Sequence, residues 1–340
     1  MRGGSLAAAA RLAWAQRRRS SCCAAAELRT VPAVPGSVQE YHHHIFVKLP
    51  PRPSDVQPWW PAAVEREPAV LAVFRALAQH RAQIGPGVKT KVTAFDEVQQ
   101  SARGPREGTC ELLVWPAGLR YTALPVADID AVVAHALAAT GTPQPLPLAA
   151  RSRQVRTASL HCSRALPVKT APPTLPAAAA VRCWVQAELG SSVMLFVCCH
   201  AARDARCGAR GPPLAAELLR QVRARGLEGR VQVLQSSHVG GHRFAGNLLV
   251  YGPSHPADGD WFGGLTEEDA PQFLEALAEM DLGTDGGAGD ARLRRWWRGR
   301  MGLAPGEQAE LFAAGGGLVE EELATDDEDD ESEGEGEDEE

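Results

Sequence analysis

Short apolar segments of strand length alternate with helix-length segments in two successive sets, and this alternation is the feature that most limits the fold. The first set, within residues 40–140, predicts a small α/β domain. Its expected strands are residues 42–50, 88–97 and 110–116, and its expected helices are residues 62–81, interrupted at Pro68, and residues 127–140.

The second set begins near residue 179 and repeats the alternation. Its helix at 212–226 opens on prolines and ends at Gly226, and its helix at 266–280 has Thr266 as a cap with acidic residues in the first turn. The expected strands are residues 191–199, 230–237 and 247–253, preceded by residues 183–190 as a strand or a helix end. The order strand, helix, strand, strand, helix is typical of a thioredoxin-like layer with helices against a mixed sheet, so the fold class is α/β with two small α/β units.

Three further segments differ from these units in composition. Residues 141–178 hold many prolines and predict a linker. Residues 1–30 carry six arginines and one acid, Glu27, and predict a transit peptide for mitochondria, with the matrix as the destination and the chloroplast as the alternative. Residues 313–340 end in an acidic run that cannot bury enough apolar surface to fold, so we expect a disordered tail.

The net charge of −7 is an average of these unlike parts. The run 326–340 contains twelve carboxylates and no base, so the body of the chain between the two termini is close to neutral. A neutral body gives no reason to expect nucleic-acid binding, and no run of eighteen apolar residues predicts a membrane span. The acidic tail is interpreted as a solvated charge run, with docking to a basic partner as the alternative.

Two cysteines and two histidines stand where neighbouring strands are expected to end. Cys198 closes an apolar run, and Cys207 follows after eight residues. His238 and His242 follow the next strand-like segment, and two of the three residues between them are Gly240 and Gly241. In a parallel arrangement both loops leave the same sheet edge, so the four side chains can converge there.

Thiolates and imidazoles favour zinc or iron over magnesium or calcium. The eight-residue gap between Cys198 and Cys207 is long for a structural zinc site and suits a larger, two-iron centre. A [2Fe–2S] cluster with two thiolates and two neutral imidazoles carries less negative charge than one with four thiolates, so its reduction potential is higher. Its exposed imidazoles should take up protons on reduction, which predicts one-electron chemistry with a potential that falls as pH rises.

Three stretches resemble the sucrase/ferredoxin-like family of thioredoxin-like ferredoxins. They are "CCHAARDARCGARGPPL", "SSHVGGHRFAGNLLVYGP" with "GDWFGGLTEED", and "WWRGRMGL". The similarity is strongest to the branch of altered-inheritance-of-mitochondria proteins, whose pattern is Cys, any residue, His, Arg-Asp, Cys-Gly and later two histidines three residues apart. The resemblance implies bis-Cys, bis-His ligation of a [2Fe–2S] cluster, with the ligands Cys198, Cys207, His238 and His242.

Neighbouring residues have less specific interpretations. Cys199 is a second candidate thiol, and His200 is expected to make a loop hydrogen bond. Gly240 and Gly241 let the backbone curl around a metal centre. Arg203, Asp204 and Arg206 either orient the ligands and donate hydrogen bonds to the cluster or pair with one another. The segment 292–303 is expected to form a C-terminal clasp on the domain at 179–312.

The sequence therefore predicts an organellar electron carrier or redox sensor that serves an unidentified redox partner protein. An enzyme with its own small-molecule substrate is not expected, because no facing carboxylate pair of the kind a glycosidase needs can be singled out. Two alternatives remain: a structural zinc-binding interaction protein, and a thioredoxin-like thiol oxidoreductase in which Cys198 or Cys199 attacks a disulfide. Against the second, the chain has no CxxC pair.

Overall fold

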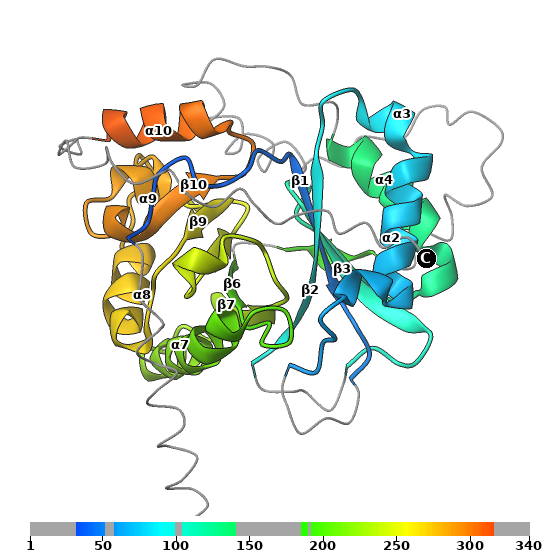
Figure 1. Cartoon of the computed structure of the whole chain (residues 1–340), viewed down its shortest axis with the longest axis horizontal. Coiled ribbons are helices and arrows are strands. Elements are labelled where there is room, and N and C mark those ends of the chain that lie inside the picture. Colours follow the sequence, from blue (N-terminus) through cyan, green and yellow to red (C-terminus); the bar gives the residue numbers. More distant parts are fainter. Residues whose placement is uncertain (1–31, 52–57, 99–103, 141–184, 190–191, 316–340) are drawn as a thin grey trace, which may run out of the picture.

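The computed structural model describes residues 32–51, 58–98, 104–140, 185–189 and 192–315 (Figure 1). The predicted transit peptide, the proline-rich linker at 141–178 and the acidic run 326–340 lie outside the described residues. Among the residues that are described, no helix is both long and apolar enough to cross a membrane.

The first α/β unit has the order strand, helix, three strands, helix. Its apolar β1 is buried along its whole length, and α2 begins at Pro68, whose fixed φ suits the first helical turn. The elements are β1 (His43–Lys48), α2 (Pro68–Gln79), α3 (Arg81–Ile84), β2 (Thr90–Glu97), β3 (Thr109–Trp115), β4 (Leu119–Pro125) and α4 (Ile129–Thr140), with short 3-10 turns at Val64–Arg66 and Val126–Asp128. The strand β4 adds to the expected pattern.

The second unit repeats this order and adds a C-terminal extension. The unit comprises β6 (Val193–Cys198), α7 (Ala205–Ala224), β7 (Val231–Ser236), β8 (Leu248–Tyr251), β9 (Asp260–Phe262) and α8 (Ala270–Ala278), preceded by β5 (Val185–Glu188). The extension comprises α9 (Gly286–Gly289), β10 (Trp297–Arg300) and α10 (Pro305–Ala314), and 3-10 turns lie at His242–Phe244, Glu267–Asp269 and Arg294–Trp296. The helix expected at 212–226 begins seven residues earlier, at Ala205.

All ten strands of the described residues belong to one mixed sheet, in the order β10-β9-β8-β6-β7-β2-β1-β3-β4-β5. In each unit the first two strands are parallel and the next two are antiparallel, which is the thioredoxin-like arrangement anticipated from the sequence. Antiparallel pairing of β2 with β7 joins the units, with Phe95 opposite Ser236. The two units therefore share one sheet and are copies in topology.

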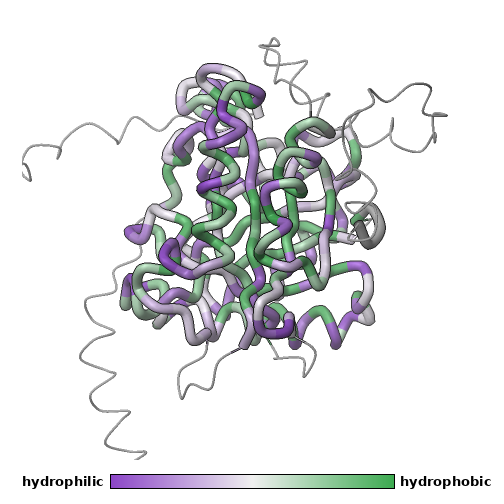
Figure 2. Tube along the Cα trace, turned by 90° about the vertical axis from the view of Figure 1, so that its right-hand side faces the viewer, coloured by the Kyte–Doolittle hydropathy of each residue, from purple (hydrophilic) through white to green (hydrophobic). Residues whose placement is uncertain are grey.

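Three apolar clusters hold this sheet between its helices. One packs α2 and α4 on the first unit, and another packs α7, α8 and α10 on the second (Figures 1 and 2). The third lies on the opposite sheet face and contains residues of both units. There Phe46 of β1 stacks on Phe196 of β6 with ring centroids 3.8 Å apart, although two strands separate β1 from β6. The sheet must therefore curve strongly where the units join.

Candidate metal centre

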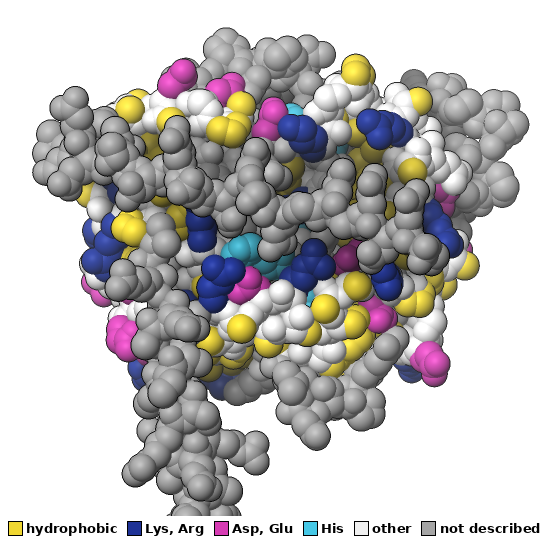
Figure 3. Space-filling view, in the orientation of Figure 1, with side chains coloured by type: hydrophobic (Ala, Val, Ile, Leu, Met, Phe, Trp, Pro, Cys, Tyr) yellow, Lys and Arg dark blue, Asp and Glu magenta, His cyan; other side chains and the backbone are white. Residues whose placement is uncertain are grey.

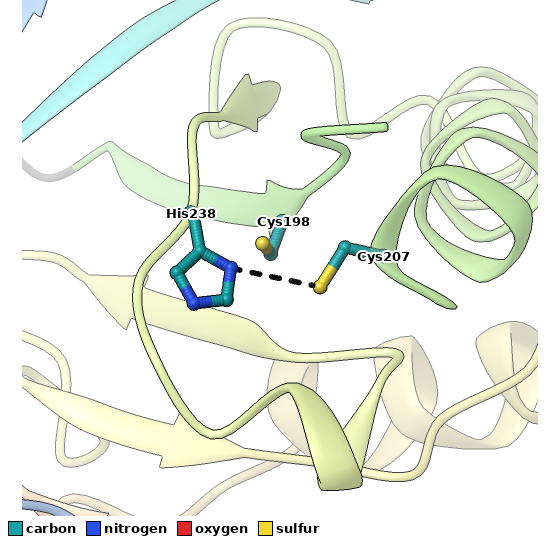
Figure 4. A group of neighbouring side chains, drawn as sticks. All are labelled: Cys198, Cys207 and His238. Atoms are coloured by element: carbon teal, nitrogen blue, oxygen red, sulfur yellow. Dashed lines mark hydrogen bonds between the residues drawn. The ribbon is translucent and has the colours of Figure 1, made fainter. Parts of the chain in front are cut away.

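The candidate site lies where β6 and β7 end side by side. Cys198 is the last residue of β6 and is opposite Ser236, the last residue of β7. His238 follows two residues later, and Cys207 lies in the first turn of α7. The two sulfur atoms and one ring nitrogen of His238 all lie within 4.8 Å of one another (Figure 4). The structure therefore brings together three of the four predicted ligands.

The early start of α7 is what carries Cys207 to this position. Asp204 caps the helix, and its carboxylate accepts a hydrogen bond from the backbone N–H of Arg206 at 2.9 Å. One turn later Gly211 packs so closely on β6 that a Cβ there would overlap the carbonyl oxygen of Cys198. Gly211 thus lets the first turns of α7 pack against the end of β6. Cys207, which the sequence placed in a loop, therefore lies in a helix.

The pKa values of the two thiols of the centre are shifted in opposite directions. A hydrogen bond from the Cys207 thiol, assisted by contacts with His238, holds the pKa of Cys198 well below its ordinary value although the residue is completely buried. The same contact with Cys198, together with burial, raises the pKa of Cys207. Cys207 also approaches Nδ1 of His238 at 4.0 Å, so this nitrogen faces the sulfur atoms. One thiolate is therefore already stabilised before any metal binds.

The two residues that follow Cys198 do not face the other predicted ligands. Cys199 belongs to the apolar cluster beneath α7, because successive residues of an extended chain point to opposite faces, and burial raises its thiol pKa well above the ordinary value. His200 accepts a hydrogen bond on Nδ1 from the backbone N–H of His238 at 3.2 Å, so its Nε2–H donates to the carbonyl of Pro61 at 3.0 Å. His200 thus ties the loop of His238 to the first unit.

His242 lies at the solvent side of the centre and outside the group of three close ligand atoms. Its ring is 49% exposed and lies 5.7 Å from the ring of His238, measured between centroids. Its Nδ1 lies 3.6 Å from a carboxylate oxygen of Asp204. Gly240 and Gly241 both have positive φ, +94° and +63°, which lets the chain turn sharply between the two histidines. On the face shown in Figure 3, histidine side chains reach the surface between basic side chains.

The three charged residues at the start of α7 make hydrogen bonds or ion pairs with groups other than the predicted ligand thiols. Arg206 forms a two-pronged ion pair with Asp204, at 2.9 and 3.1 Å, and this pair lowers the pKa of Asp204. Arg203 extends toward the first unit, where it lies 3.4 Å from the carbonyl of Ala62 and 3.9 Å from Glu65. The arrangement matches the alternative in which Asp204 and Arg206 pair with each other.

Comparison with known proteins identifies the relatives of this chain. The profile of the Sucrase/ferredoxin-like family matches residues 34–299, which is most of the chain. The chain belongs to the Sucrase/ferredoxin-like family. Its candidate ligands Cys198, Cys207, His238 and His242 all lie inside the matched range.

Curated relatives of this Sucrase/ferredoxin-like chain match it over shorter stretches. "Altered inheritance of mitochondria protein 32" is 36% identical over 101 residues in Candida glabrata and 41% identical over 130 residues in Kluyveromyces lactis, which is 27% and 35% of this chain. "Actin patches distal protein 1" of Saccharomyces cerevisiae is 34% identical over 92 residues, or 24% of this chain. The matches span 30%, 35% and 28% of these relatives, about a third of their length. A thioredoxin-like [2Fe–2S] ferredoxin from Aquifex aeolicus aligns with 34% of the chain and 98% of its own length, at 16% identity and a TM-score of 0.27.

Two residues of this Sucrase/ferredoxin-like chain connect the ligand loops and were not expected at the site. Asn247 accepts a hydrogen bond from the backbone N–H of Cys198 on its carbonyl at 3.0 Å, and its side-chain amide donates to the carbonyl of Gly241 at 3.0 Å. Arg298 of β10 donates to the side-chain oxygen of Asn247 at 2.5 Å. The sequence placed Arg298 only in the expected C-terminal clasp, and neither residue stands in a local pattern that marks a site.

Proposed function

We propose that this chain is an electron-transfer or redox-sensing protein that binds a [2Fe–2S] cluster through Cys198, Cys207, His238 and His242. The observation that carries the proposal is the convergence of two buried thiols and an imidazole nitrogen within 4.8 Å at one sheet edge. The membership in the Sucrase/ferredoxin-like family supports the same chemistry.

The residues present fit such a group by their donor chemistry. The set holds thiols and imidazoles, and Asp204, the nearby acid, is already engaged with Arg206 and His242. Soft sulfur and borderline nitrogen donors suit iron with sulfide and do not suit calcium or magnesium. When bound, the cluster would supply one-electron oxidation and reduction.

The cysteines and the histidines would have different roles at the cluster. Cys198 and Cys207 are fully buried and would hold the cluster on its protein side. The half-exposed His242 would leave an imidazole edge at the surface, where a partner protein and protons can approach. Asp204, whose carboxylate lies 3.6 Å from Nδ1 of His242, would orient the ring.

Zinc is the second candidate for this site. Three ligand atoms within 4.8 Å also fit around one ion, and a structural zinc site would make the chain an interaction protein. The thiol oxidoreductase alternative has less support, because Cys198 and Cys199 have no exposed surface from which to attack a disulfide.

We propose a mitochondrial location, in the matrix, from the composition of residues 1–30 and from relatives whose name refers to inheritance of mitochondria. The redox partner is a protein of unknown identity, and the acidic run 326–340 is proposed to dock a basic partner. Fusion of residues 1–40 to a fluorescent protein should direct it to mitochondria, while a fusion with Arg17, Arg18 and Arg19 replaced by Ser should stay in the cytosol.

The cluster is tested on the full chain purified without oxygen. We expect a brown protein with two irons and two acid-labile sulfides per chain, visible absorption that dithionite bleaches, and a paramagnetic signal from the reduced form. A Cys199→Ser variant is the matched control, since that thiol faces away from the centre, and it should keep the same iron content. A colourless protein with one zinc per chain contradicts the proposal and supports the zinc alternative.

A further inference from the structure

Two cationic side chains, Arg298 and Lys91, lie over the ring of Trp261 near the candidate metal centre. Arg298 comes from β10 and is 2% exposed. Lys91 comes from β2, in the other unit; it is half-buried, and its Nζ lies over the rings of Tyr41 and Trp261 at 5.8 and 5.3 Å. Burial of a charge is costly unless something compensates it, so the presence of two cations here needs an explanation.

Neither cation has a carboxylate partner within the described part of the chain. Arg298 donates to the side-chain oxygens of Asn247 and Ser37, to the Ser37 carbonyl at 3.2 Å, and stacks over Phe244 at 4.2 Å. All of these are uncharged groups. Other buried cations are neutralised: Arg300, two residues along β10, pairs with Asp260 at 2.6 Å, and Lys48 pairs with Glu97 at 2.7 Å.

A thiolate at Cys198 would supply negative charge that complements Lys91 and Arg298. Burial lowers the pKa of Arg298 to about 9, with repulsion from Arg243, and burial and the charge of Arg298 lower the pKa of Lys91. In both cases a negative charge on the Cys198 sulfur acts in the opposite direction and stabilises the protonated cation. The geometry agrees with this, because Lys91 and Arg298 lie over the same Trp261 ring at 5.3 and 5.9 Å and Arg298 packs against Gly241 of the histidine loop.

Arg298 also contacts the histidine loop directly and is connected to the end of β6 through Asn247. Its guanidinium fills the space where a side chain on Gly241 would lie, directly before His242. It also donates a hydrogen bond to the side chain of Asn247, whose backbone carbonyl accepts the N–H of Cys198. A cation held in this place by three neutral acceptors cannot move away when the charge of the centre changes, so its field on the centre is permanent.

We propose that Lys91 and Arg298 raise the reduction potential of the centre bound at Cys198, by stabilising the extra negative charge that the reduced centre carries. This inference rests on the proposed function. Electron uptake adds one negative charge to the centre, and a fixed positive charge inside a medium of low dielectric constant favours the reduced form. The electrostatic potentials that two fixed charges produce at a third site superpose, so the effects of the two cations on the centre should add.

The test measures the reduction potentials of two kinds of variant of the cluster-loaded protein: those that remove the positive charge and those that keep it. Lys91→Met and Arg298→Gln should each lower the equilibrium constant for one-electron reduction about tenfold, which corresponds to about 59 mV. The double variant should lower it about a hundredfold. Lys91→Arg and Arg298→Lys keep the charge and should stay within about twofold of the original protein, which separates an electrostatic role from a merely structural one.

Lys89→Met is the matched surface control, because Lys89 precedes β2 by one residue and its side chain is 62% exposed. The reduction potential of Lys89→Met should not change. The lower potentials of Lys91→Met and Arg298→Gln should persist in 1 M salt, which screens exposed charges. If Arg298→Gln fails to fold, Lys91→Met alone decides the question. Unchanged potentials with full iron and sulfide content overturn this inference and leave the proposed function intact, whereas zinc without iron in the original protein refutes the proposed function itself.

Discussion

The two α/β units place different chemistry at the same point of the same backbone arrangement. Lys48 ends β1 as Cys198 ends β6, and their partners across the parallel pair are Phe95 and Ser236. Two residues beyond these partners stand Glu97 in the first unit and His238 in the second. Lys48 and Glu97 form an ion pair at 2.7 Å, where the second unit has a thiol and an imidazole. The topology thus supplies a place where side chains meet, and the residue types decide what it binds.

The connections after β1 and β6 differ in the same sense. Six residues lead from Cys198 to α7, which brings Cys207 back to the end of β6. In the first unit nineteen residues separate Lys48 from α2, and part of this longer connection covers the second unit. Trp60 packs edge-on against His200 at 6.0 Å between ring centroids, and Pro61 accepts its hydrogen bond. The first unit therefore covers His200, next to the candidate centre of the second unit.

Loss of iron is the largest effect expected when the residues that distinguish the two units are replaced. Cys198→Ser and Cys207→Ser should each reduce iron and sulfide to background, because a serine oxygen is a poor ligand for iron and the remaining set is incomplete. Lys48→Met, at the position equivalent to Cys198, should keep the full iron content measured by colorimetric assay. Iron retained in both cysteine variants would place the centre elsewhere.

The acid stability of the first unit should depend on His43, whose counterpart in the second unit is Val193. Burial lowers the pKa of His43 to about 4, so between pH 6.5 and 4 the unfolded chain holds a proton that the folded chain does not. Stability supplied by the neutral ring is therefore lost as pH falls, at about 1.4 kcal/mol per pH unit and about 3 kcal/mol in total.

Urea unfolding of His43→Val at several pH values measures this effect. The difference between variant and original protein isolates it, because buried Asp258, whose pKa is raised to about 7 by burial, gains stability as pH falls and opposes the trend. The variant should become relatively more stable below pH 6.5. A difference that does not vary with pH would show that His43 does not set the acid limit.

Lys48→Met should also destabilise the fold, by about 2 kcal/mol. The Lys48 side chain is 6% exposed and lies between Glu97 and Asp96, while Glu97 is 36% exposed, so water reduces the penalty below that of a fully buried pair. Chemical denaturation measures the change. The double variant Lys48→Met with Glu97→Gln should recover part of the loss, and an equal or larger loss would mean that the lysine acts through packing.

The smallest expected effect distinguishes the two glycines of the histidine loop. A methyl group added at Gly240 would meet open space, so Gly240→Ala should cost about 1 kcal/mol for its positive φ alone. Gly241→Ala adds a clash with Arg298 and should cost more and lower the iron content. Thermal unfolding and iron analysis check both variants, and equal behaviour of the two would argue against the packing of Arg298 on Gly241.

Most elements with strong local patterns could be predicted, and the exceptions have identifiable physical causes. The strands β1, β2, β3, β6, β7 and β8 lie within the expected segments, to within one residue at their ends. The three-residue β9 and the mixed Trp-Arg segment of β10 were not expected, because such strands form only through pairing with a neighbour. The early start of α7 was missed because the prolines at 212 and 213 suggested a first turn, whereas Asp204 supplies the cap.

By itself the sequence determined the α/β class, the two repeated units and the proximity of Cys198, Cys207 and His238, because hydrophobic periodicity and the parallel strand pair act locally. The tertiary structure decided that the units share one sheet, that Cys198 and not Cys199 faces Cys207 and His238, and that Lys91 and Arg298 lie over one Trp261 ring. These outcomes depend on which strands become neighbours and how the sheet curves, and residues distant in the chain determine both.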